Sequence, residues 1–419
     1  MSPIKKTALF NASCVALVVT ALAFATRGSF VEIWTKEFNL THTQVGWIVG
    51  TAFWGFTLAM IFGGPLVDII GIGRIISIAF VCHVIGIIMT ILASGFWTLF
   101  ISTLFVGIAN GSVEAACNPL ITSMYTEEKT RRLNRFHAWF PTGIVIGGLM
   151  VYLFTKLGIA DWRFSMGAML IPTLWYGIWF LNKEFPKTER VVSGFTYKEM
   201  LKACVSPLFI FIACCMILTA ATELGTNQWI AALMANVTDS PILLLVWISG
   251  IMALARQTGG TLIHNMKSTV VLLTSAILAF AGLLLLGNTT GAMVFVAAAV
   301  FALGVAFFWP SMLGFVSENI PQSGALGLAI MGGIGFLGGA IAQPALGAIF
   351  DAQTRLALPV NQTLESLKNA LSGTPEASVW EQVQLTAGAH TLLYVAIVPA
   401  VLILAFGYLY IYKRKQLAK

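Results

Sequence analysis

The chain has 419 residues, of which 58% are hydrophobic and only 10% are charged, and its formal net charge is +7. Soluble domains carry about a quarter charged residues, so this composition excludes an ordinary soluble protein and indicates a chain whose solvent is the lipid bilayer. A membrane-spanning helix needs about 20 mostly apolar residues, and the length leaves room for about a dozen such helices.

Apolar runs and the polar breaks between them predict an all-α polytopic membrane protein with twelve spans. The first run lacks a small-residue cleavage site and continues as a full span, so we interpret it as a retained helix rather than a signal peptide. The predicted spans cover residues 8–36, 44–69, 73–94, 96–124, 134–157, 163–183, 205–235, 240–263, 268–287, 291–318, 322–350 and 388–412.

Lysine and arginine are distributed unequally between the two sets of loops. Of the 24 such residues, 17 lie in the loops on the side of the termini and five in the opposite loops, while Arg27 and Arg256 fall inside spans. Because positively charged loops stay in the cytoplasm, this asymmetry supports an even number of spans and predicts cytoplasmic termini in a cell (inner) membrane. It also explains the net charge without a nucleic-acid partner.

The longest polar connection between spans on the side of the termini divides the chain. Residues 184–204 are predicted to be a cytoplasmic linker between two pseudo-symmetric six-helix halves, residues 1–183 and 205–419. Residues 351–387 are expected to form a long outer loop. The halves echo each other weakly, in the pairs Glu32 and Glu223, Trp34 and Trp229, and Asn118-Pro119 and Trp309-Pro310.

Polar residues inside the spans are the candidate site, because ionisable groups there usually face a cavity or a partner. Asn110, Glu114 and Asn118 recur every four residues and share one helical face. This stripe is interpreted as a solute and proton site or, alternatively, as a satisfied interhelical hydrogen-bond cluster. The seventh span repeats the pattern with Glu223, Asn227, Gln228 and Trp229.

Other intramembrane residues have several interpretations. Arg27 and Glu32 lie roughly 140° apart around one helix, so they are expected to have different partners. Arg27 would bind an anionic substrate, pair with Glu114 or Glu223, or act as a structural counter-ion. Trp34 and Trp309 are candidates for covering the apolar face of a sugar, or anchors at the membrane interface.

The loop between the second and third spans resembles the signature of the major facilitator superfamily, with glycines at 64 and 71, Asp68 between them and basic Arg74 at the end. Ile69 and Ile72 stand where that signature is usually basic. The resemblance implies that Asp68 and Arg74 latch one access state. Arg256 and His137, near the same membrane side, are further gating candidates.

The fourth and fifth spans resemble the fucose/galactose symporter family, through Glu114-x-x-x-Asn118-Pro119 and then Arg132-Leu133-Asn134, His137 and Gly143. The resemblance implies twelve helices, proton-coupled uptake of a sugar, and roles for Glu32 and Glu114 in coupling. The chain departs from the fucose permease at His137 and Phe140, where that permease has a glutamine and an asparagine in its fifth helix.

These observations together predict a secondary active transporter, a monomer, that carries a sugar such as a monosaccharide, or a related polyhydroxylated solute, by cation-coupled symport. The coupling ion is expected to be the proton, with sodium as the alternative. The alternative function is transport of an organic anion, drug or lipid, with Arg27 in the site. The sequence contains no nucleotide-binding loop, metal-ligand cluster or nucleophile motif, so we expect no enzyme activity, cofactor or metal.

Overall fold

The computed structural model describes residues 3–125, 129–187, 197–238, 240–262, 266–368, 370 and 373–417. These residues form helices and turns and contain no strand. The helices before the predicted linker are α1 (Pro3–Glu37), α2 (His42–Ile70), α3 (Ile72–Ile91), α4 (Phe96–Met124), α5 (Lys129–His137), α6 (Trp139–Lys156), α7 (Trp162–Ala168) and α8 (Leu170–Phe180).

The second part of the chain contains helices of the same kind and one π-helical turn. They are α10 (Tyr197–Cys204), α11 (Pro207–Ala220), the π-helix η1 (Ala221–Gly225), α12 (Thr226–Leu233), α13 (Ile242–Leu262), α14 (Ser268–Leu286), α15 (Met293–Ala306), α16 (Phe308–Asn319), the 3-10 turn η2 (Pro321–Ser323), α17 (Gly324–Leu356), α18 (Leu364–Lys368), α19 (Pro375–Val395) and α20 (Ile397–Leu417).

The predicted spans all coincide with helices. Ten helical stretches of the described chain are long and apolar enough to cross a membrane. The predicted sixth span consists of α7 and α8, which are separated only by Met169, and the predicted eighth span is α13, whose apolar part Ile242–Thr258 is shorter. The protein is therefore a multi-pass, all-α membrane protein.

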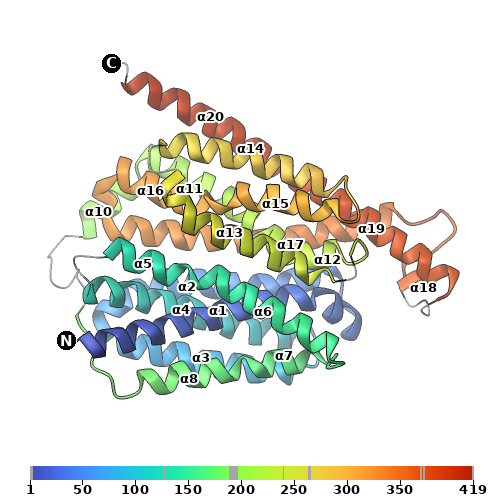
Figure 1. The fold of residues 1–419 in the computed structure, drawn as a ribbon, viewed down its shortest axis with the longest axis horizontal. Coiled ribbons are helices and arrows are strands. Elements are labelled where there is room, and N and C mark those ends of the chain that lie inside the picture. Colours follow the sequence, from blue (N-terminus) through green and yellow to red (C-terminus); the bar gives the residue numbers. More distant parts are fainter. Residues whose placement is uncertain are drawn as a thin grey trace.

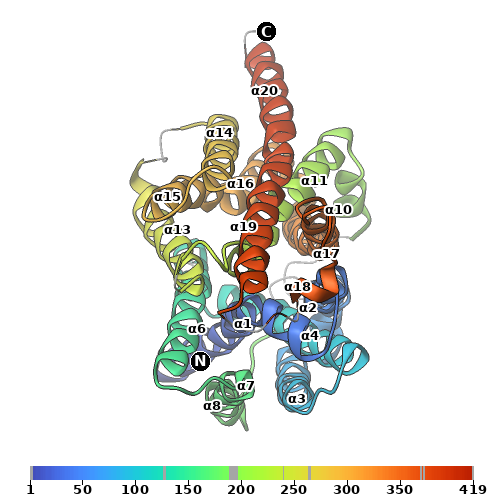
Figure 2. The ribbon, with the colours of Figure 1, turned by 90° about the vertical axis from the view of Figure 1, so that its right-hand side faces the viewer.

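The helices form two groups that lie side by side (Figures 1 and 2). Helices α1–α8 make up the first helix group and α10–α20 the second, and they meet where α2 contacts α17, α6 contacts α13 and α1 contacts α12. Both termini lie at the same end of the bundle in Figure 1, which we call the terminal end. The opposite end, which carries α18, is the distal end.

Two segments differ from their expected form. The predicted outer loop, residues 351–387, contains the last turns of α17, all of α18 and the first half of α19, because α17 continues past the apolar residues. Within the predicted linker 184–204, α10 begins at Tyr197, and residues 188–196 lie outside the described residues.

The connection between α2 and α3 is a single residue. Helix α2 continues through Pro65 to Ile70, and Gly71 then turns the chain with φ of 91°, a backbone conformation that glycine adopts without strain. The predicted signature loop is therefore mostly helical. Its Asp68 lies in the last turn of α2, and the structure does not describe that side chain.

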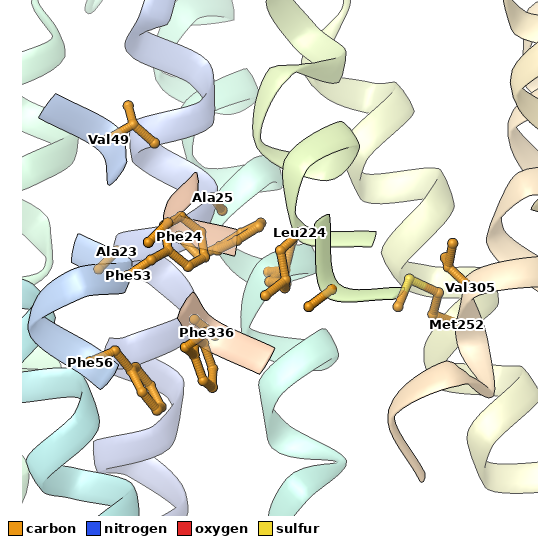
Figure 3. Packing of buried hydrophobic residues seen from close by; sticks show 14 of the residues in the cluster. Ala23, Phe24, Ala25, Val49, Phe53, Phe56, Leu224, Met252, Val305 and Phe336 are labelled. Carbon is orange, nitrogen blue, oxygen red and sulfur yellow. The ribbon is translucent and has the colours of Figure 1, made fainter. Parts of the chain in front are cut away.

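Aromatic residues fill the centre of the contact between the two groups (Figure 3). The ring of Phe56 on α2 stacks on Phe336 of α17 with centroids 3.5 Å apart. Phe24 of α1 packs edge-on against Phe53 of α2 at 5.9 Å, and Leu224 of η1 lies on the facing side. This apolar layer joins α1 and α2 of the first group to η1 and α17 of the second.

Candidate functional site

Arg27 is buried in the interior of the bundle, on the turn of α1 that follows Phe24. Its side chain is 3% exposed, and its Nε and Nη1 atoms have no hydrogen-bond partner in the described part of the chain. A charged group without a counter-ion inside a membrane protein is costly, so it points to a ligand or a functional role. Of the interpretations of Arg27, pairing with Glu114 or Glu223 is absent among the described residues.

Glu223 pairs with a different arginine, Arg256. Glu223, in the π-helical turn η1, accepts a hydrogen bond from Arg256 Nη2 at 3.0 Å, and Arg256 Nε donates to the carbonyl of Ala306 at 2.8 Å. π-helical turns inside α-helices occur frequently at functional sites. The structure thus joins a predicted substrate-binding residue and a predicted gating residue in one ion pair within the second helix group.

The polar stripe of α4 is held mainly from within the first helix group. His83 of α3 lies between Tyr176 and Asn110, with its Nδ1 2.8 Å from the tyrosine hydroxyl and its Nε2 2.8 Å from Asn110 Oδ1. Glu114, 8% exposed, lies beside the Asn118 side chain, whose Oδ1 has no partner among the described residues. Asn110 is therefore already hydrogen-bonded, whereas Glu114 has no ion-pair partner and Asn118 has a free acceptor among the described residues.

The two amide side chains of α12 contact different helices, Gln228 α1 and Asn227 α13. Gln228 Nε2 donates to the carbonyl of Phe24 at 3.2 Å, while the Asn227 amide contacts the sulfur of Met252 at 3.8 Å. The acceptor atoms Asn227 Oδ1 and Gln228 Oε1 are buried and have no partner in the described chain. Buried polar atoms are normally satisfied, so these oxygens indicate a site for donors of a bound molecule.

The three predicted tryptophans lie in different surroundings. Trp34 packs within the first helix group against Phe30 and Trp162, with ring centroids 5.9 and 5.7 Å apart. Trp229 Nε1 donates to Gln343 Oε1 of α17 at 2.9 Å. Trp309 packs against Phe336 at 5.3 Å and so lies next to the aromatic layer between the groups.

The remaining gating candidates lie nearer the terminal end. His137, the last residue of α5 in the first helix group, lies in the neighbourhood of Arg256 on α13 in the second group. Arg74 is exposed, and its Nη1 donates to the carbonyl of Ile70 at 3.4 Å. The latch role of Asp68 and Arg74 stays a prediction.

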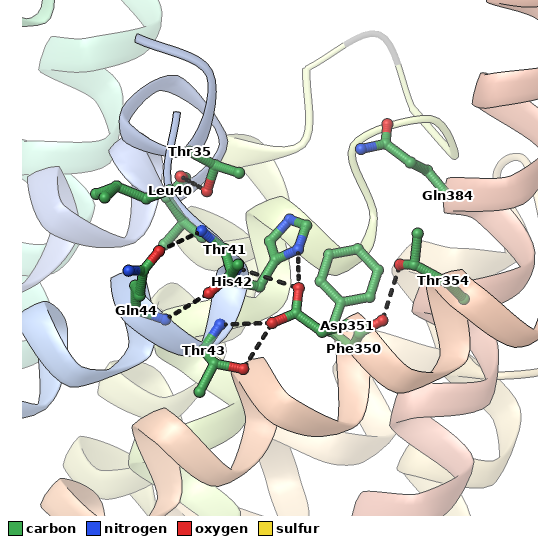
Figure 4. Close-up of polar contacts among 12 residues, drawn as sticks. Thr35, Leu40, Thr41, His42, Thr43, Gln44, Phe350, Asp351, Thr354 and Gln384 are labelled. Atoms are coloured by element: carbon green, nitrogen blue, oxygen red, sulfur yellow. Dashed lines mark hydrogen bonds and ion pairs between the residues drawn. The ribbon is translucent and has the colours of Figure 1, made fainter. Parts of the chain in front are cut away.

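The distal end contains a charged network that the sequence reasoning missed. His42 at the start of α2 lies between two acids. Its Nε2 is 2.9 Å from Glu32 Oε1, and its Nδ1 is 2.9 Å from Asp351 Oδ1 (Figure 4). Gln384 Nε2 donates to Glu32 Oε2 at 3.5 Å. Sequence analysis predicted a coupling role for Glu32 but not its partners. His42 is 10 residues from Glu32 and 309 residues from Asp351, so helical spacing gave little indication that the three side chains meet.

The twelve-span fold and these buried charges define a polytopic helical membrane protein of the transporter class. The family model described as Major Facilitator Superfamily matches residues 13–343, which is most of the chain. The chain therefore belongs to the Major Facilitator Superfamily, whose members are transporters rather than enzymes.

Relatives with known names match only part of the chain. A D-xylose transporter of Levilactobacillus brevis is 26% identical over 138 residues, which cover 33% of this chain and 30% of that protein. The sodium-dependent phosphate transport protein 1, chloroplastic, of Arabidopsis thaliana is 26% identical over 159 residues, covering 37% and 31%. The matched segment thus spans about a third of either relative.

The fold comparison covers the whole molecule. A bacterial homologue of the human lysosomal transporter Spinster, in an inward-facing and unoccupied conformation, superposes with a TM-score of 0.75. The match covers 97% of this chain and 98% of that chain at 15% sequence identity. At this identity the likeness shows a shared fold.

Proposed function

We propose that this protein is a secondary active transporter of a small hydroxylated organic anion, a solute of the sugar-acid class. It would act as a monomer in a cell (inner) membrane, with its terminal end in the cytoplasm and its distal end outside. The two helix groups would rock against each other about a site between α1, α4 and α12. Protons are the proposed coupling ion.

Arg27 is the observation that carries this proposal. Its Nε and Nη1 atoms are buried donors without partners in the described chain, while Glu223 is paired with Arg256 and Glu32 with His42. A guanidinium presents its donors in a planar fork that matches a carboxylate. A carboxylate on the solute would supply the counter-charge that the described residues do not give to Arg27.

The free acceptor atoms of α12 favour a hydroxylated anion over a simple one. Asn227 Oδ1 and Gln228 Oε1 have no donors in the described chain, and Gln228 approaches α1 one residue beyond Arg27, at Gly28. Solute hydroxyl groups would donate to these oxygens. The combination of one carboxylate and several hydroxyl groups is the chemistry of a sugar acid.

A neutral monosaccharide is the second candidate. The same amide oxygens would accept its hydroxyl hydrogens, and part of this chain resembles a D-xylose transporter. The difference between the two candidates is the contribution of the Arg27 charge.

Counterflow in proteoliposomes distinguishes the two candidates. We expect labelled sugar acids to exchange faster than the matching neutral sugars. Arg27→Gln should lower exchange of the acid about tenfold to a hundredfold, because a hydrogen bond to a charged group contributes about 1.5–3 kcal/mol. Arg27→Lys should retain part of the activity, since it preserves the charge but not the fork.

Lys156→Gln, which removes an exposed charge at the distal end, serves as the matched control and should leave exchange unchanged. Preferential exchange of neutral sugars, unaffected by Arg27→Gln, would establish the second candidate instead. Exchange of neither class would exclude both.

A further inference from the structure

The distal network connects the two helix groups through one histidine. His42 and Glu32 belong to α2 and α1 of the first group, and Asp351 belongs to α17 of the second group. The side chain of His42 is 8% exposed and those of both acids are 19% exposed. We call Glu32, His42 and Asp351 the distal triad.

Asp351 also closes the start of α2. Its Oδ1 accepts from the backbone N–H of His42 at 3.1 Å, and its Oδ2 accepts from the N–H and hydroxyl of Thr43 at 2.9 and 2.6 Å (Figure 4). The first N–H groups of a helix lack partners within the helix and favour a negative charge. A residue of one helix group thus caps a helix of the other, and separation of the groups would break every one of these contacts.

The geometry of His42 determines how many N–H donors its ring must carry. Each ring nitrogen of His42 lies 2.9 Å from a carboxylate oxygen. A neutral imidazole has one N–H, whereas an imidazolium has two, and an ionised carboxylate has none. Both contacts are hydrogen bonds only when the triad carries one proton more than a neutral histidine and two carboxylates.

Basic residues lie close to the triad, but the two contacts of the His42 ring still need a hydrogen atom each. A small cavity beside it is lined by groups from α1, α2, α17, α18 and α19. Within the described chain, the titratable and charged residues that line the cavity are Glu32, Lys36, His42, Asp351, Arg355 and Lys368, and α19 contributes the uncharged Gln384 and Trp380. Lys368 Nζ donates to the Leu40 carbonyl at 3.5 Å.

We propose that the distal triad is a proton-binding lock, which holds the distal ends of the two helix groups together while it carries the additional proton. Loss of the proton leaves one His42–carboxylate contact without a hydrogen atom and two negative charges close together. Raising the pH therefore favours separation at the distal end, and proton uptake favours closure. The inference rests on the proposed transport cycle, since it requires the groups to separate, but it is independent of the solute.

Spin-label distances test the lock without any solute. Labels at Ile159→Cys, between α6 and α7, and Val360→Cys, between α17 and α18, report the distal separation in a background with the six native cysteines replaced. We expect short distances at about pH 5. The long-distance population should at least double at about pH 10, because the two flanking carboxylates hold the additional proton on His42 to a higher pH than an isolated histidine would.

Three variants of the distal triad make the test specific. His42→Gln binds no additional proton and should show no pH response, and His42→Lys, which is permanently charged, should keep the short distance at both pH values. Should His42→Gln fail to give monodisperse protein, Asp351→Asn is the substitute, and its long-distance population should dominate at both pH values.

The matched control is Glu37→Gln. Glu37 is also a distal acid, but its partner Arg163, at 2.6 Å, belongs to the same helix group. This variant should keep the wild-type pH response. The lock would be overturned if the distance between the labels in the wild-type protein did not change with pH, or if His42→Gln showed the full pH response. Normal pH-dependent distances in a protein that exchanges neither sugar acids nor sugars would instead reject the proposed function and leave the lock standing.

Discussion

Glu114 and Arg27 are buried charged residues that no ion pair neutralises among the described residues, and they lie on α4 and α1 of the same helix group. Burial favours the neutral form of a carboxylic acid, so Glu114 is suited to gain and lose a proton. Arg27 has no such freedom, because its guanidinium stays charged. This difference supports a division of roles, with Arg27 binding the solute anion and Glu114 carrying the proton.

Glu114→Gln should abolish accumulation driven by a proton gradient, because glutamine has no titrating group, while solute exchange without a gradient should persist. Uptake and counterflow in the same proteoliposomes measure the two activities. Glu184→Gln is the control, since Glu184 is exposed and its pair with Lys5 is a surface contact of small energetic value. Full accumulation with unchanged pH dependence in Glu114→Gln would contradict the coupling role.

The contact between α2 and α17 is the element on which distal closure depends. The two helices touch closely near Gly46, where an added Cβ would lie 2.6 Å from the Gln343 carbonyl oxygen and 2.8 Å from Pro344 Cα. Both neighbours are backbone atoms, so they have no side-chain rotation with which to adjust. Small residues let helix backbones approach closely in a membrane.

Gly46→Ala should force α2 and α17 apart at the distal end, at a cost of about 1–3 kcal/mol for overpacking. We expect a larger long-distance population between the labels at 159 and 360, and a lower melting temperature in detergent. Gly64→Ala on the same helix is the matched control, because no atom lies within 4 Å of its added Cβ. Equal effects of the two substitutions would show that helix propensity, rather than the contact, determines the result.

At the scale of the whole molecule, the two helix groups are in contact from the aromatic layer to the distal triad. Phe56 and Phe336 stack at the centre, and His42 joins Asp351 at the distal end. An additional proton in the triad would be supplied from the distal side, which is the outer side in the proposed orientation. Proton binding and closure of the outer side would then be a single event.

A pH gradient, acid on the distal side, should therefore drive accumulation of the solute in proteoliposomes, and a protonophore should abolish it. Flux of labelled solute measured together with internal pH tests this expectation. Accumulation that survives the protonophore but requires sodium would replace the proton by sodium as coupling ion. Transport that only equilibrates the solute, with neither gradient having an effect, would rule out symport.

The sequence by itself determined the class of protein and most of its elements. Low charge and long apolar runs require a lipid environment, so a multi-pass, all-α fold was predictable, and it is confirmed. The superfamily was predicted from the resemblance of the loop around Asp68 to its signature, and it is confirmed too. Polar residues inside spans are rare, so Arg27, Glu114, Glu223 and Asn227 were recognisable as buried polar groups before their surroundings were known.

Only the tertiary structure decided which of these groups are partners. Glu223 and Arg256 are 33 residues apart, and His42 and Asp351 are 309 apart, so no helical periodicity connects them. Helix α17 continues past its apolar residues, and Asp351 in this extension contacts the start of α2, which hydropathy does not reveal. Pairing across distant helices is a property of the packed bundle, and for that reason the lack of a partner for Arg27 and the contacts of the distal triad emerge only from the tertiary structure.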